Sequence, residues 1–136
     1  GEIVAKGKSP KSGEAWKIGI DSPNEKAERS LQSILAISNE ALATSGNYRK
    51  FRIDEITGDK YVHSINPLIG KPVRSKVLSV SVKAPNCMMA DAYATALMVM
   101  PFVESKALIE SNNGLAAYWI LSSDGGQLEE VFSSRW

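Results

Sequence analysis

VLSVSVKAPNCMMADAYATALMVM, residues 77–100, changes its hydrophobic period midway, and this change sets the fold class. Apolar and polar side chains alternate from Val77 to Val82, which is typical of a β-strand with one buried face. Pro85 ends that strand because it lacks a backbone N–H. Asn86 is a favourable N-cap for a helix that we expect from Met88 to about Met100. The sequence therefore predicts a strand followed directly by a helix in this stretch.

The flanking segments add mostly strands, separated by turn residues. Leu31–Ser38 fits a strand better than a helical turn, and Glu104–Ser111 is expected to form a second helical piece. Three hairpins are predicted: Glu2–Lys6 with Ala15–Ile20, Tyr48–Ile53 with Lys60–His63, and Ala116–Leu121 with Leu128–Phe132. Together these elements predict an α+β domain, a mostly antiparallel sheet packed with about two helices.

Length and composition restrict the class of protein. The chain has 136 residues and 43% hydrophobic content, enough for the core of one globular domain. Sixteen Lys and Arg balance fifteen Asp and Glu. The resulting net charge of +1 gives no indication of nucleic acid or an anionic membrane as a partner. Cys87 is the single cysteine, which excludes an intramolecular disulfide and makes structural zinc an unsuitable hypothesis.

Two further features concern the place of the chain in the cell. The most apolar stretch, Met88–Val103, is shorter than the roughly 20 residues that a membrane-spanning helix needs and is interrupted by Asp91. The chain starts at Gly1 with a segment that already resembles a strand. We therefore expect a fragment of a longer protein, although a processed or engineered start would have the same form.

Asp91 and Thr95 are the polar interruptions of the apolar helix, and their spacing places them on one helical face with Met98 and Phe102. An ionised carboxylate on an apolar face is costly unless a cation neutralises it, and carboxylate and hydroxyl oxygens suit Mg²⁺, especially with a phosphate. The alternative is structural. Asp91 would then be a favourable carboxylate in the first helical turn, and Thr95 would bond back to a carbonyl.

Two other stretches are candidates for binding or catalysis. His63 is the single histidine and precedes an Asn-Pro turn, where it could act as a base, a phosphate contact or a structural residue. In ATSGNY, residues 43–48, the backbone N–H groups around Thr44, Ser45 and Gly46 could cradle a phosphate. A bulge or turn explains that stretch equally well.

These stretches together resemble the C-terminal half of the ApbE family, the FAD:protein FMN transferases. The resemblance lies in the ordered motifs ATSGNY, YVHSINPLIGKP and MADAYATAL, preceded by GEIVAKG and WKIGIDSP. It extends over nearly the whole chain. It implies an ApbE-like, T-fold-like domain in which residues 1–136 form the C-terminal part, joined to an N-terminal half that carries much of the flavin pocket.

The resemblance also implies an activity and its residues. Members of the family cleave FAD with the help of Mg²⁺ and transfer FMN to a threonine hydroxyl of an acceptor protein, releasing AMP. By this resemblance Asp91 and Thr95 bind the magnesium, His63 orients or deprotonates the attacking hydroxyl, and Thr44, Ser45 and Gly46 lie near the flavin nucleotide. An extracytoplasmic location, often with a lipid anchor, is implied in the same way.

The sequence departs from the family pattern at two positions of one loop. Ile69 replaces the usual threonine before Gly70, and Asn66 replaces the usual acidic residue before Pro67. These departures leave open a flavin-binding or protein-interaction module without turnover. A third alternative, beside this module and the transferase, is an FAD pyrophosphatase that releases FMN to water.

Overall fold

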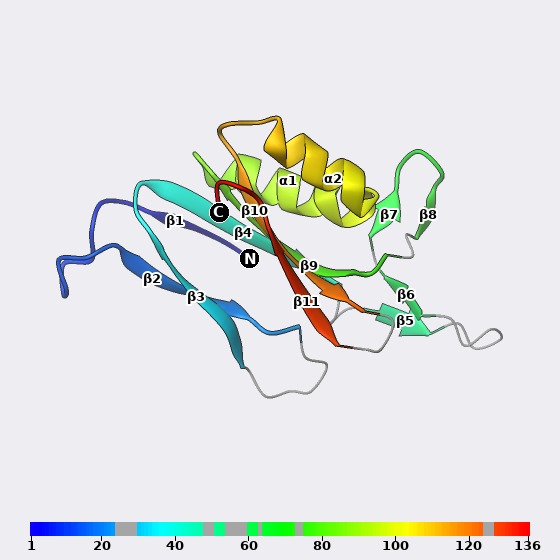
Figure 1. Ribbon diagram of the computed structural model, residues 1–136, viewed down its shortest axis with the longest axis horizontal. Coiled ribbons are helices and arrows are strands. Elements are labelled where there is room, and N and C mark those ends of the chain that lie inside the picture. Colours follow the sequence, from blue (N-terminus) through cyan, green and yellow to red (C-terminus); the bar gives the residue numbers. More distant parts are fainter. Residues whose placement is uncertain (24–29, 48–50, 54–59, 63, 73–74, 124–126) are drawn as a thin grey trace.

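The computed structural model describes residues 1–23, 30–47, 51–53, 60–62, 64–72, 75–123 and 127–136. Its largest unit is a five-stranded antiparallel sheet in the order β1-β4-β9-β10-β11, with two helices on one face (Figure 1). The elements in chain order are β1 (Glu2–Ala5), β2 (Trp16–Asp21), β3 (Leu31–Ile37), β4 (Glu40–Gly46), β5 (Phe51–Ile53), β6 (Lys60–Val62), β7 (Ile65–Asn66), β8 (Lys71–Pro72), β9 (Val77–Ala84), α1 (Cys87–Val99), α2 (Phe102–Glu110), β10 (Ala116–Ser122) and β11 (Leu128–Phe132). This architecture confirms the predicted α+β class.

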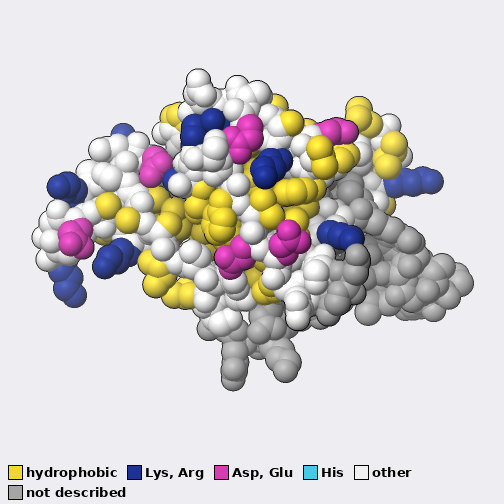
Figure 2. All heavy atoms as spheres, in the orientation of Figure 1, with side chains coloured by type: hydrophobic (Ala, Val, Ile, Leu, Met, Phe, Trp, Pro, Cys, Tyr) yellow, Lys and Arg dark blue, Asp and Glu magenta, His cyan; other side chains and the backbone are white. Residues whose placement is uncertain are grey.

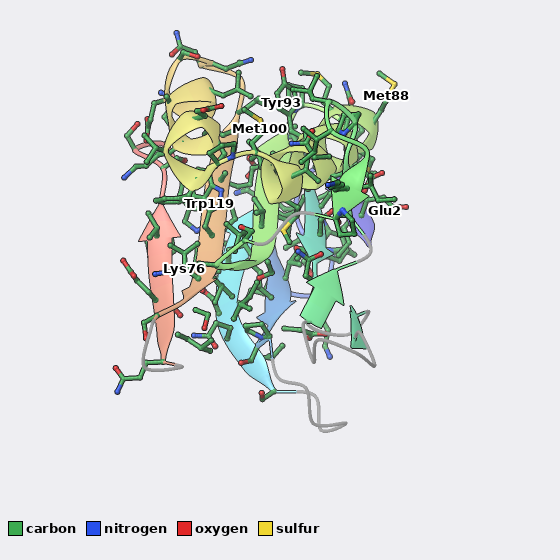
Figure 3. All side chains as sticks on the ribbon, turned by 90° about the vertical axis from the view of Figure 1, so that its right-hand side faces the viewer. Glu2, Lys76, Met88, Tyr93, Met100 and Trp119 are labelled. Atoms are coloured by element: carbon green, nitrogen blue, oxygen red, sulfur yellow. The ribbon has the colours of Figure 1, made fainter. Side chains whose placement is uncertain are left out.

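The main core lies between the sheet and the helices. Strands β4 and β9 contribute alanine and valine side chains, and β10 adds the larger Trp119 and Leu121. Helix α1 contributes Ala90, Ala94, Leu97 and Met98, all at most 1% exposed. Small alanines on both surfaces let α1 approach the sheet closely. At the other end of this layer, the Phe102 ring of α2 meets the Trp119 ring edge to face, with centroids 5.7 Å apart. Trp119 is labelled in Figure 3.

The opposite face of the sheet is covered by the β2–β3 pair and the C-terminal tryptophan. Ile20 of β2 is buried with Tyr118 and Ile120 of β10, and Leu35 of β3 and Trp136 pack against this group. Because alternate residues of a strand point to opposite faces, β10 is buried on both sides, with Trp119 facing the helices and Tyr118 facing β2 and β3.

Several predicted elements are confirmed with small shifts of their ends. Asn86 caps α1, Pro85 follows the end of β9, and β10 and β11 form the predicted hairpin. Phe51–Ile53 pairs with Lys60–Val62 as expected. Residues 48–50 and His63, included in that second predicted hairpin, lie outside the described residues.

The predicted hairpin between the first two strands is wrong. β1 pairs with β4, in the register Ile3 to Leu42, while β2 pairs with β3 in a separate two-stranded sheet. Burial explains the choice. Ile20 on β2 buries its side chain against the second face of the main sheet, which a hairpin with β1 in the plane of that sheet would not allow. In the described part of the chain, neither helix is both long and apolar enough to cross a membrane.

Candidate functional site

Helix α1 is the element that positions the two predicted magnesium ligands. Its first turn is fixed by Asn86, whose side-chain Oδ1 accepts a hydrogen bond of 2.9 Å from the Met89 N–H. Its apolar side is held against the sheet by β4 and β9. The rotation of the helix about its axis is therefore set from both its end and its buried face.

Asp91 and Thr95 both lie on the exposed side of α1, one turn apart. This corrects the expectation of a carboxylate on an apolar face, because the apolar side of α1 is a neighbouring stripe. Asp91 and Thr95 also do not share their face with Met98, as the spacing had suggested, because Met98 is buried at 1% exposure. The structural alternative for Asp91 is corrected too, since no acidic residue lies in the first turn of the helix. Among the described residues, none forms a hydrogen bond or ion pair with Asp91.

Strand β4 brings part of the second motif to this helix. Ala41 and Ala43 are fully buried on the side that faces the helices, and Ser45 follows on the same side. The Ser45 Oγ lies 3.3 Å from the Thr95 Oγ1, a contact between residues 50 positions apart. The structure thus joins a predicted flavin-segment residue directly to a predicted metal ligand.

Thr44 points to the other face of the sheet, where its hydroxyl lies 2.7 Å from the Ser81 Oγ of β9. Its backbone N–H donates to the carbonyl of Gly1. The expectation of a bulge, a turn or a phosphate-cradling loop at Thr44, Ser45 and Gly46 is therefore wrong, because these residues end a strand paired with β9. Any ligand at this segment would meet side chains from one face of the sheet rather than a nest of free N–H groups.

Asn47, directly after β4, is a polar residue that the sequence motifs did not single out. It is 4% exposed, its backbone N–H donates to the Leu78 carbonyl at 2.9 Å, and its Oδ1 accepts a hydrogen bond of 3.3 Å from the Ser64 hydroxyl. Its side-chain Nδ2 is buried, and no acceptor among the described residues pairs with it. A buried unpaired donor costs about 1–3 kcal/mol, which a ligand oxygen would recover.

The β7–β8 hairpin carries the two departures from the family pattern. The Asn66 Oδ1 accepts from the Leu68 N–H at 2.9 Å, and its carbonyl accepts from the Gly70 N–H at 2.8 Å. Gly70 has a φ of 63°, a conformation that suits glycine. Asn66 therefore supports the turn itself. Ile69 is 63% exposed beside Leu68, and hydrophobic side chains gather over this hairpin (Figure 2).

A hollow of about 420 Å³ lies at the C-terminal end of α1. It is lined by the ends of α1 and β10, the start of α2, Asn66 and the residues from Ser75 to Val77. Met100 and Lys76, two of its lining residues, mark its position in Figure 3. Its volume lies in the range of small-molecule sites. Sequence motifs gave no signal for it because its walls come from distant segments.

The donor set of Asp91 and Thr95 fits a hard cation. Both supply oxygen atoms from an exposed face, which is the chemistry that Mg²⁺ selects, and this ion usually keeps a few protein ligands beside waters and phosphates. The described residues contain no group of three or more His, Cys, Asp or Glu side chains placed to hold a metal. A cation at this position would therefore take its remaining ligands from a phosphate or from further parts of the protein.

Comparison with known proteins gives one consistent family. The model of the ApbE family matches residues 1–119. An FAD:protein FMN transferase of Vibrio cholerae is 39% identical over 134 residues, covering 98% of this chain and 39% of that protein. One from Haemophilus influenzae is 38% identical over 127 residues, covering 93% of this chain and 35% of that protein. The chain thus spans well under half the length of these curated relatives.

Solved structures show the same similarity in three dimensions. The flavin transferase ApbE from Vibrio cholerae superposes with a TM-score of 0.77 at 34% identity, covering 98% of this chain and 40% of its own. The apo form of the Pseudomonas stutzeri flavinyl transferase ApbE has a TM-score of 0.77 at 29% identity, covering 98% and 39% of the two chains.

Proposed function

Because the chain belongs to the ApbE family, we propose that it is the C-terminal part of an FAD:protein FMN transferase. The complete protein would bind FAD, cleave its pyrophosphate, transfer FMN to a threonine hydroxyl of an acceptor protein and release AMP. The observation that carries the proposal is the pair Asp91 and Thr95, one turn apart on the exposed side of α1, with the Ser45 hydroxyl of β4 3.3 Å from that of Thr95.

In this proposal each described residue has a stated task. Asp91 and Thr95 hold Mg²⁺ through a carboxylate and a hydroxyl oxygen. The ion, when bound, would stabilise the negative charge that develops on the pyrophosphate oxygens. Asp91 has no internal partner among the described residues, so its charge is available for this role. We assign the unpaired Asn47 Nδ2 as a hydrogen-bond donor to an oxygen of the substrate.

The other assignments rest on the family pattern. His63, outside the described residues, is proposed to orient or deprotonate the attacking threonine hydroxyl. Thr44, Ser45 and Gly46 are proposed to border the flavin nucleotide, with Ser45 on the side of α1. We also propose an extracytoplasmic location for the complete protein, with a lipid anchor as its attachment.

The test uses the complete protein, incubated with FAD, Mg²⁺ and an acceptor domain that carries a threonine, followed by the intact mass of the acceptor. We expect a gain of one FMN unit, abolished by Asp91→Ala. Glu104→Ala, which removes another exposed carboxylate from the neighbouring helix, is the matched control and should retain transfer. Free FMN and AMP without acceptor modification would indicate a pyrophosphatase instead. Intact FAD with an unmodified acceptor would indicate a binding module.

A further inference from the structure

We propose that Ser45 is a positioning residue for the metal site: its Oγ accepts the hydroxyl hydrogen of Thr95 and thereby directs an oxygen lone pair of Thr95 outward to the cation. This inference rests on the proposed function and changes the role of Ser45 from a flavin contact to a partner of Thr95. It starts from the 3.3 Å contact between the two hydroxyl oxygens.

The chemistry of a hydroxyl group gives this contact a direction. A threonine hydroxyl has one hydrogen and two lone pairs. When one lone pair binds a cation, the hydrogen must go to an acceptor on another side of the oxygen. Ser45 Oγ is the acceptor that the described residues offer to Thr95. Partners of this kind fix the orientation of metal ligands, and their loss typically weakens metal binding by 10- to 100-fold.

The contact matters because a helical threonine has a competing arrangement. Its hydroxyl can bond back to a carbonyl three or four residues earlier, which turns the oxygen along the helix instead of outward. The neighbouring helix shows this arrangement twice: the Ser105 hydroxyl donates to the Phe102 carbonyl, and the Ser111 hydroxyl donates to the Leu108 carbonyl, each at 2.9 Å. Thr95 instead places its oxygen against Ser45, which favours the rotamer that a metal ligand needs.

The position of Ser45 is fixed by the sheet rather than by a loop. It pairs with Val80 of β9, and the two preceding residues on the same side of β4, Ala43 and Ala41, are fully buried beneath the helices. This register holds the backbone and Cβ of Ser45 beside α1, where its hydroxyl reaches Thr95. The sheet therefore holds the hydrogen-bond partner of Thr95 in place.

The test replaces Ser45 with Ala in the complete protein and measures binding of Mn²⁺, a paramagnetic substitute for Mg²⁺, by electron paramagnetic resonance in the presence of FAD. We expect the dissociation constant for Mn²⁺ to rise about 10- to 100-fold. The Mg²⁺ concentration for half-maximal transfer should rise in parallel, with an unchanged KM for FAD at saturating Mg²⁺. Ser45→Thr, which keeps the hydroxyl, should restore binding.

Ser81→Ala is the matched control. It removes a serine hydroxyl from the neighbouring strand, but that hydroxyl bonds to Thr44 on the opposite face of the sheet. Its Mn²⁺ affinity should equal that of the wild-type protein.

Two results would overturn the inference while leaving the proposed function intact. One is unchanged Mn²⁺ affinity in Ser45→Ala beside an active wild-type protein. The other is a raised KM for FAD with normal Mn²⁺ affinity, which would make Ser45 a flavin contact. A wild-type protein that neither binds Mn²⁺ nor transfers FMN would refute the proposed function itself, and the inference with it.

Discussion

Replacing Asp91 with Ala is expected to stabilise the complete protein slightly in metal-free buffer, although it removes a functional group. Asp91 lies on the exposed side of α1, one turn after the helix begins at Cys87. No acidic residue lies in the first turn, so the helix dipole contributes little at Asp91. Alanine is the better helix former by up to roughly 0.7 kcal/mol. We therefore expect the free energy of unfolding to rise by about 0.5 kcal/mol.

Magnesium should reverse this order. A ligand that binds only the folded protein adds about 2.7 kcal/mol to its stability at a free concentration of 100 times its dissociation constant. The wild-type protein should gain this amount with Mg²⁺ and FAD relative to FAD alone, and Asp91→Ala should gain almost none. The wild-type protein would thus be less stable than Asp91→Ala without Mg²⁺ and more stable with it. A purely structural carboxylate cannot produce this reversal.

The assay is urea unfolding followed by far-ultraviolet circular dichroism, in EDTA and then in Mg²⁺ with a constant FAD concentration. Glu104→Ala serves as the control, because it removes an exposed carboxylate from α2 and should respond to Mg²⁺ like the wild-type protein. A loss of more than about 1 kcal/mol for Asp91→Ala in EDTA would refute the reasoning, since a surface carboxylate that pairs with none of the described residues cannot cost that much. Equal stabilisation of both proteins by Mg²⁺ would refute the metal assignment.

Three further predictions concern the supports of the site. Asn86→Ala should lower the free energy of unfolding by about 1 kcal/mol in thermal denaturation, because the N–H of Met89 loses its cap; an unchanged melting temperature would contradict this. Arg135→Ala should lower the free energy of unfolding in urea by about 2 kcal/mol, because the guanidinium donates hydrogen bonds to carbonyls at the end of α2. A loss below about 0.5 kcal/mol would show that water replaces these hydrogen bonds. Hydrogen bonds from Ser134 lower the pKa of Glu110, so the stability they give is complete above the ordinary glutamate pKa and is lost as the pH falls through the lowered value. Glu110→Gln should therefore flatten the fall of the melting temperature below the ordinary glutamate pKa, and an unaltered acid slope would argue against it.

The sequence predicted α1 and β9 well because their signals are local. Asn86 and Pro85 act on the adjacent backbone, and the alternation in Val77–Val82 records burial on the strand itself. The pairing of β1 and β2 is a different kind of property. Both segments were recognised as strands, but the turn-like connector between them does not determine which strand each one joins. That choice depends on the burial of Ile20 against β10, a contact across about 100 residues of sequence.

The candidate site likewise has features that the sequence predicted and features that depend on distant contacts. The spacing of Asp91 and Thr95 placed both on one helical face, and the structure confirms that they share one. The sequence could not say that this face is exposed, because the stripe of Ala90, Ala94 and Leu97 beside it is just as compatible with the pattern. It also could not give the contact of Thr95 with Ser45, which depends on the register of β4 against β9.

Exposure of Asp91 and Thr95 changes the physical argument for a metal and strengthens it. A buried carboxylate would need a cation to offset its desolvation, and it would require a closed set of ligands nearby. An exposed pair, with the Thr95 hydroxyl held by Ser45, leaves one side of a cation open to other oxygens. Mg²⁺ accepts this arrangement because it commonly combines one or two protein ligands with substrate phosphates. The chain spans 39% of its Vibrio cholerae relative, so we expect further ligands to come from the rest of the protein as well as from FAD.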